Sequence, residues 1–174
     1  MWKCGGAKAA MGASLDEVVA CAQKAISHTR SIGIGLAPCT IPSYGKPNFS
    51  IEPGTMEFGI GHHGEPGVRV EPIRDARGMA AEMVKAVCED APFERGDEVI
   101  LLVSGLGATP VMEQYIFSAS VFDELSERNI SVHRSYVGNY FTSLEMSGIT
   151  LTMMRLDDEL RECIDNLADR KSVV

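Results

Sequence analysis

Two adjacent histidines, His62 and His63, are the residues of this chain best suited to chemistry, and they stand in the segment Met56–Gly67, which reads MEFGIGHHGEPG. Gly59 and Gly61 remove side chains from one face of the short strand that this alternation predicts. An imidazole beside bare backbone can act as a base, as a hydrogen-bond partner or as a nucleophile toward a carbonyl carbon. A structural histidine explains the residues equally well. The pattern alone therefore indicates a site for something small without fixing its chemistry.

Strand geometry separates the two histidines. Neighbouring residues of a strand point to opposite faces, so His62 and His63 cannot easily share one ion. No HExxH motif and no third ligand accompany them, and we expect no metal site. Counting along the strand places His63 on the face of Gly59 and Gly61, and His62 on the apolar face. Strand parity thus favours His63 as the residue that faces a ligand.

The overall composition describes an ordinary globular domain with an acidic surface. The chain has 174 residues, of which 45% are hydrophobic and 23% are charged, and its formal net charge is −8. This length supports one substantial core and by itself predicts a single domain. The acidic balance argues against a nucleic-acid backbone or an anionic membrane surface as partner.

The cysteines and the hydropathy of the chain indicate the cellular compartment in which it works. The five cysteines are scattered without a CxxC or a paired spacing, so we expect buried free thiols in a reducing environment. They are Cys4, Cys21, Cys39, Cys88 and Cys163. No apolar stretch reaches transmembrane length, and residues 1–14 lack the apolar core of a signal peptide. These observations predict a cytoplasmic protein.

Hydrophobic periodicity predicts strands and helices that alternate along the chain. Helices are expected at about 15–28, 75–89, 110–128 and from 157 onward, and strands at 31–38, around 58–60, and at 97–103, 130–137 and 149–156. Ser14 and Glu17 form a capping box for the first helix, and Asp157 caps the last. Helices inserted between mixed strands predict an α/β or α+β domain, built on a mixed β-sheet with flanking helices.

Three Gly-X-Gly stretches raise the possibility of a phosphate-binding turn: Gly33–Gly35, Gly59–Gly61 and Gly105–Gly107. None completes a GxGxxG or GxxxxGK[ST] motif in its proper context. The third lies between a strand and a helix N-terminus that could receive an anion, although a plain turn is the simpler interpretation. Thr109 is the expected N-cap of that helix, and Pro110 its first residue.

The start of the chain differs in character from the rest. Residues 1–13 are small and loosely patterned, and Trp2, a residue type that normally needs burial, stands close to the terminus. We expect residues 1–13 to be the remnant of a preceding segment or a frayed end. The folded domain is then expected at 14–168, with a tail at 169–174.

The segment Met56–Gly67 resembles the MEFGxGxHGEPG signature of the substrate-binding subunit of dihydroxyacetone (glycerone) kinases. Further blocks match that family in order, from about residue 12 to residue 160. These blocks are Ser31–Pro42, Gly45–Pro47, Leu106–Pro110, Thr142–Gly148 and Leu156–Glu159. Only the C-terminal of the subunit's two sequential halves is matched. The resemblance therefore implies that residues 14–168 are a C-terminal ketone-binding domain.

The resemblance also implies a role for one histidine. In that family the histidine before GEPG, here His63, bonds through a ring nitrogen to the carbonyl carbon of the substrate and forms a hemiaminal. His62 occupies a position that is usually aliphatic. Gly59 and Gly61 are implied as substrate-binding neighbours. Such a bond forms with short-chain ketones and aldehydes but not with glycerol, so covalency supplies selectivity.

Other parts of the family's machinery have no counterpart in the sequence. We find neither the glycine-rich loop with a second histidine nor the aspartate of the N-terminal half, and no helical nucleotide-binding domain. The resemblance thus implies that this chain binds no cofactor itself. ATP or ADP would sit on a nucleotide-binding subunit, and an N-terminal half and a homodimeric partner are expected.

Two functions remain open at this stage. The first is a component of a dihydroxyacetone kinase of glycerol metabolism, inactive as a kinase without its partners. The second is a non-catalytic module that senses a short ketone or holds another small ligand for regulation.

Overall fold

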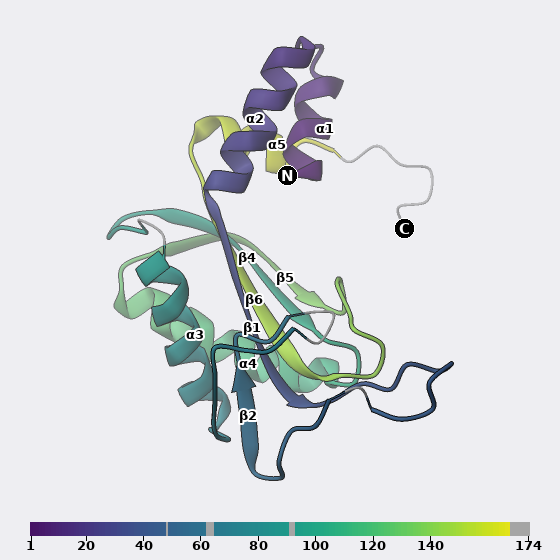
Figure 1. Ribbon diagram of the computed structural model, residues 1–174. Helices are drawn as coiled ribbons and strands as arrows, with labels where there is room; N and C mark the ends of the chain where they lie inside the picture. The colour runs from purple at the N-terminus through teal and green to yellow at the C-terminus, as the bar shows by residue number, and fades with distance from the viewer. Residues whose placement is uncertain (48, 62–64, 91–92, 168–174) are drawn as a thin grey trace. The chain divides into compact units, whose positions relative to one another are not determined.

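The structure of the chain, a computed structural model, describes residues 1–47, 49–61, 65–90 and 93–167. Within these ranges helices and strands follow one another much as the periodicity predicted (Figure 1). In chain order they are α1 (Trp2–Ala10), α2 (Leu15–Ser27), β1 (Thr29–Ala37), β2 (Thr55–Phe58), β3 (Arg69–Pro72), α3 (Ala76–Asp90), β4 (Glu98–Gly105), α4 (Val111–Glu127), β5 (Ser131–Gly138), β6 (Ser147–Arg155) and α5 (Asp158–Asp165).

The strands form one mixed six-stranded sheet in the order β3-β2-β1-β6-β4-β5. β2 pairs antiparallel with β1, where Ile34 lies opposite Phe58, and it also pairs antiparallel with β3. β4 and β5 pair in parallel, with α4 as the connection between them. The predicted mixed sheet with flanking helices is confirmed.

Helices α3 and α4 cover one face of this sheet. Alternate residues of a strand share a face, and Val99, Leu101 and Val103 of β4 all lie in the main core. The same core contains Met83 of α3 and Phe117 of α4. The β4 residues on this face are accordingly buried by these two helices.

The chain divides into two compact units rather than the single one suggested by its length. One unit comprises residues 30–153, with the sheet, α3 and α4. The other comprises residues 1–29 and 154–174, and its described part contains α1, α2 and α5.

Local capping residues begin two of the helices of the second unit, as predicted. The backbone N–H of Ser14 donates to the Glu17 carboxylate at 2.8 Å, and the N–H of Glu17 donates to the Ser14 hydroxyl at 3.5 Å. Asp157 accepts from the N–H of Leu160 at 2.8 Å. These hydrogen bonds satisfy amides that have no partner inside their helices.

The first residues form a helix rather than a frayed end. Cys4 and Ala7 of α1 are buried, and α1 packs against α2 and α5. Trp2 is 86% exposed, so it does not contribute to this packing. The predicted tail at 169–174 lies outside the described residues.

The same unit contains a pair of close thiols and a cluster of ion pairs around Lys24. The sulfur atoms of Cys21 and Cys163 are 3.7 Å apart, and burial raises the pKa of the Cys163 thiol to about 12. Lys24 binds Asp157 at 2.9 Å and Glu159 at 2.5 Å. All five cysteines are free thiols, as expected, and only Cys88 is not fully buried.

The described helices are all too short or too polar to span a lipid bilayer.

Candidate functional site

The strand that was expected to carry the histidine pair ends before it. β2 stops at Phe58, and Gly59 adopts a φ of +83°, the left-handed region that favours glycine. Its N–H still donates to the carbonyl of Gly33 at 2.7 Å. The alternation of faces therefore does not continue past Phe58, and strand parity no longer separates the two histidines. His62 and His63 both lie outside the described residues, so the choice between them rests on the family resemblance.

The space beside the glycines is filled by the chain itself. A Cβ atom on Gly59 would lie 2.9 Å from a methyl of Val68, and one on Gly61 would collide with the carboxylate of Glu65. The N–H of Gly61 donates to the carbonyl of Glu65 at 3.1 Å. These glycines let residues 59–61 and 65–68 approach each other closely. The space beside them is occupied by Val68 and Glu65 and is not open. Their contact with a substrate stays a prediction.

Residues 58–68, called the site loop from here on, are fastened at the base. The N–H of Val68 donates to the carbonyl of Phe58 at 2.7 Å, and the N–H of Gly67 donates to the half-buried Glu57 carboxylate at 2.5 Å. Hydrogen bonds thus join the two described ends of the segment in which the sequence places the histidine pair. Glu57, an isolated charge in its strand, was not among the residues predicted to matter here.

The buried side chain of Ile60 anchors the beginning of the site loop to the sheet. Ile60 lies across Gly33 and Gly35 of β1: a Cβ at Gly35 would be 2.9 Å from the Ile60 Cδ1. The side chain is only 5% exposed. Its buried apolar neighbours are Cys39, Leu106 and Met146. The glycines of β1 therefore create a groove that this side chain fills, which sequence reasoning did not foresee.

Two further loops are joined beside this anchor. The Glu145 carboxylate accepts from the N–H of Thr40 at 2.6 Å. Hydrogen bonds from its own backbone N–H and from that of Thr40 lower the pKa of Glu145. The N–H of Ser143 donates to the carbonyl of Leu106 at 2.8 Å. Glu145 is the only charge in the block Thr142–Gly148, and that isolation was the signal available in the sequence.

The turn Gly105–Gly107 offers few amides to an anion. The N–H of Leu106 donates to the carbonyl of Gly148, and that of Ala108 donates to Met146, both at 3.1 Å. Amides engaged in this way cannot also bind a phosphate group. The interpretation as a plain structural turn is the one the geometry supports.

Thr109 does not cap α4, contrary to prediction. Its hydroxyl donates to the carbonyl of Gly148 at 2.6 Å and accepts from the N–H of Gly148 at 2.9 Å. Pro110 is the N-cap instead, and it makes no side-chain capping bond. The buried backbone groups of Gly148 need partners, and this tertiary demand outweighs the local one at the helix end. The pair is called the Thr109–Gly148 clasp below.

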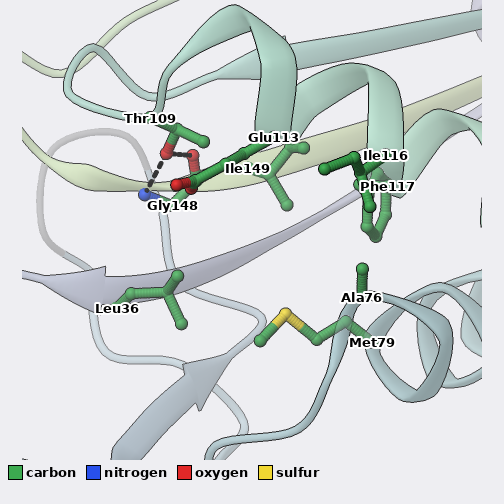
Figure 2. A pocket seen from close by; sticks show the side chains of 9 residues that line it. All are labelled: Leu36, Ala76, Met79, Thr109, Glu113, Ile116, Phe117, Gly148 and Ile149. Carbon is green, nitrogen blue, oxygen red and sulfur yellow. Dashed lines mark hydrogen bonds between the residues drawn. The ribbon is translucent and has the colours of Figure 1, made fainter.

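A cavity of about 230 Å³ lies on the helix-covered side of the sheet (Figure 2). Figure 2 shows the Thr109–Gly148 clasp at one end of it and the side chains of α3 and α4 along its wall. Its lining is mostly apolar: Leu36, Ala76, Met79, Thr109, Glu113, Ile116, Phe117, Gly148 and Ile149. Glu113 contributes the single charge. No described residue of the site loop lines this cavity.

No group of three or more histidine, cysteine, aspartate or glutamate residues in the described part of the chain could hold a metal ion.

Comparison with known proteins places these features in a family. The family model described as the Dak1 domain matches residues 1–172. The dihydroxyacetone-binding subunit DhaK of PTS-dependent dihydroxyacetone kinase 1 of Listeria innocua is 42% identical over 154 residues, which are 88% of this chain and 47% of that protein. The corresponding subunit of the PEP-dependent kinase of Escherichia coli is 33% identical and is covered over 50% of its length by 88% of this chain.

Solved structures agree with this result. A dihydroxyacetone kinase operon co-activator, Dha-DhaQ, superposes with a TM-score of 0.85 at 36% identity, over 92% of this chain and 50% of that one. The dihydroxyacetone kinase of C. freundii gives 0.76 at 28% identity, over 92% and 29% of the two chains. The chain therefore spans about half the length of the curated subunits that it matches.

Proposed function

The chain belongs to the Dak1 domain family, and on this premise we propose that it is the ketone-binding half of a dihydroxyacetone kinase-type subunit. The match to proteins described as dihydroxyacetone-binding subunits, at up to 42% identity across most of the chain, is the observation that carries this proposal.

His63 is the proposed covalent anchor. One ring nitrogen attacks the carbonyl carbon of the ketone, a new N–C bond forms, and the π bond of the carbonyl breaks. The former carbonyl oxygen takes up a proton and the other ring nitrogen gives up its own, so the ring ends neutral and no water is lost. The ketone is then held as a hemiaminal with its hydroxyl groups free for phosphoryl transfer. The choice of His63 over His62 comes from its place before Gly-Glu-Pro-Gly.

Phosphoryl transfer itself is assigned to partners. Because the chain spans about half of its curated relatives, we propose that an N-terminal half completes the substrate site. A separate nucleotide-binding subunit would supply the phosphoryl group, from ATP or from a phosphotransferase relay through ADP. This chain would bind neither nucleotide. The thiol-rich, disulfide-free composition fits work in the cytoplasm.

A regulatory module is the second candidate, and one observation favours it. The TM-score with the operon co-activator, 0.85, exceeds the 0.76 obtained with the C. freundii kinase. In that case the same site loop would hold a ketone as a signal, without phosphorylation. Both candidates share the ketone-binding step and differ in whether phosphoryl transfer to the bound ketone comes after it.

Intact-mass spectrometry under native conditions tests the shared step. With dihydroxyacetone we expect the wild type to gain the mass of one whole ketone, since a hemiaminal forms by addition. The His63→Ala variant should show no adduct. The His62→Ala variant is the matched control and should keep it. An adduct that survives in His63→Ala but disappears in His62→Ala would show that His62, and not His63, is the anchor.

Turnover separates the two candidates. The pure chain should give no phosphorylated ketone with ATP, and robust activity would contradict the need for partners. Adding an N-terminal half and a nucleotide-binding subunit from a related kinase should restore phosphorylation if the chain is an enzyme component. An adduct without any restored turnover would favour the regulatory module.

A further inference from the structure

The cavity shown in Figure 2 leads from the surface of the molecule to its main core. Its inner wall is formed by Met79, Phe117 and Ile149, which belong to that core and are at most 8% exposed. Glu113 and Ile116 of α4 line its outer part, and both are exposed to solvent. A molecule from solution can therefore enter, and apolar side chains would surround most of its surface.

Two small residues leave this space unfilled. Ala76 of α3 and Gly148 of β6 both line the cavity, and neither has a side chain long enough to reach across it. A larger residue does not fit at Gly148, because its Cβ atom would collide with the carbonyl of Ile34 on the neighbouring strand β1. The pairing of these strands thus keeps one end of the cavity free of a side chain.

The polar groups of the Thr109–Gly148 clasp have no bonding capacity left for an occupant. The Thr109 hydroxyl donates to the carbonyl of Gly148 and accepts from its N–H. That carbonyl also accepts from the N–H of Leu106 at 3.1 Å, so both of its lone pairs are in use. A buried water molecule needs several polar partners to be held in place. The interior therefore favours an apolar occupant over water.

The Glu113 carboxylate is the single charge in the lining. Figure 2 shows its side chain extending from α4 toward the clasp end of the cavity. Among the residues that the structure describes, none forms a hydrogen bond or an ion pair with this carboxylate. An acid is favourable in the first turn of α4, but helix stability does not account for its place beside an apolar cavity. A cationic group at the entrance would provide the missing partner.

The charge of the whole chain favours the same kind of ligand. The net charge of −8 attracts cations and repels anions, so a carboxylate or phosphate compound is a poor match for this cavity. A neutral apolar molecule would fill the interior but would leave Glu113 without a partner. The lining and the net charge together select a ligand with an apolar body and one positive charge.

The volume sets the size of this ligand. A dry apolar cavity of about 150 Å³ holds one benzene molecule. In the same proportion, the 230 Å³ of this cavity has room for roughly nine heavy atoms. A benzene ring with a two-carbon chain and an amino group has this size. Its ring would lie near Phe117 and the sulfur of Met79, and aromatic rings favour contacts with both.

We propose that the cavity binds a small arylalkylamine, with the ammonium group paired to Glu113 and the ring in the apolar interior. The described residues of the site loop do not line the cavity, and the proposal does not depend on ketone binding. For a ligand of this size we expect a dissociation constant on the order of 0.1–1 mM.

Titration of phenethylamine into the full chain, labelled with carbon-13 at the methionine methyl groups, tests the proposal by NMR at neutral pH. The Met79 signal, assigned with a Met79→Leu variant, should shift and saturate, whereas that of Met11 on the loop after α1 should not move. Glu113→Gln keeps the shape of the side chain and should weaken binding about fivefold, the upper range for a partly exposed ion pair. Glu127→Gln makes the same change at the other end of α4, outside the cavity lining, and should leave binding unchanged.

Two analogues of the probe separate the contribution of charge from that of apolar contact. Phenethyl alcohol has the same size without the charge and should bind the wild type about fivefold more weakly, a difference that Glu113→Gln should remove. Phenylacetate carries the opposite charge and should not shift Met79. Absence of a saturable Met79 shift at about ten times the expected dissociation constant would overturn the proposal. It would also be overturned if either analogue bound as tightly as the amine, or if Glu127→Gln weakened binding as much as Glu113→Gln.

Discussion

Replacing Thr109 with valine tests the structural role of this residue in the fold. The hydroxyl of Thr109 makes two hydrogen bonds with the backbone of Gly148, at 2.6 and 2.9 Å, and both residues are buried. Valine keeps the shape of the side chain and removes both bonds. The carbonyl of Gly148 keeps the donor supplied by Leu106, whereas its N–H loses the acceptor that Thr109 supplies.

The expected loss follows from these partners. Each intramolecular hydrogen bond contributes about 1 kcal/mol, and a buried N–H left without an acceptor costs about 1–3 kcal/mol. We therefore expect Thr109→Val to reduce the free energy of unfolding by about 2–4 kcal/mol. For a chain of this size that corresponds to a Tm lower by roughly 5–15 °C. Thr109→Ser keeps the hydroxyl and should cost only about 0.8 kcal/mol for the lost methyl group.

Urea unfolding followed by circular dichroism measures these differences, and Thr109→Asp distinguishes the clasp from a helix cap. Aspartate is as good an N-cap as threonine or better, so a capping role predicts little change. In the clasp, a carboxylate cannot donate to the Gly148 carbonyl and would face it with a negative charge, so Asp should cost at least about 3 kcal/mol. An Asp variant as stable as the wild type would refute the clasp.

Two further predictions concern stability. Gly107→Ala should cost more than about 3 kcal/mol in urea unfolding, because Gly107 has a φ of +135° and its Cβ would collide with the backbone carbonyl of Leu144; Gly96→Ala, with a φ of +94° and open space, should cost about 1 kcal/mol. The hydrogen bond from Lys24 lowers the pKa of Glu159 below its ordinary 4.5. This pair therefore stabilises the fold above that value and loses its effect as the pH falls through the lower folded-state pKa. In Glu159→Gln, the free energy of unfolding should fall less on acidification than in the wild type. The difference should be at most about 1 kcal/mol, since both side chains are about one-third exposed.

The sequence predicted best what is decided locally. The capping box at Ser14 and the cap at Asp157 depend on residues three positions apart, and both form as expected. The strands expected at 31–38 and 97–103 were predicted from their own residues, and β1 and β4 form there. These assignments needed no knowledge of distant parts of the chain.

The errors arose where distant residues compete with local preference. Thr109 has the sequence context of a helix cap, yet its hydroxyl serves Gly148, a residue 39 positions away. Propensity carries no information about that partner. Helix α1 was not predicted for a related reason. The burial of Cys4 and Ala7 depends on packing against α2 and α5.

The site loop shows how a correct motif can be explained by the wrong geometry. Strand parity selected His63 by extending β2 through residues that have already left the sheet, since Gly59 turns the chain at a φ of +83°. In the described residues of the site loop, a hydrogen bond joins Phe58 to Val68, and the buried side chain of Ile60 packs against the sheet. Each glycine of the motif that the structure describes removes a collision within this loop or with β1, rather than leaving space for a ligand. The spacing of these glycines therefore fits the close approach of the two described ends of the loop, and the reactivity assigned to His63 depends on the family resemblance.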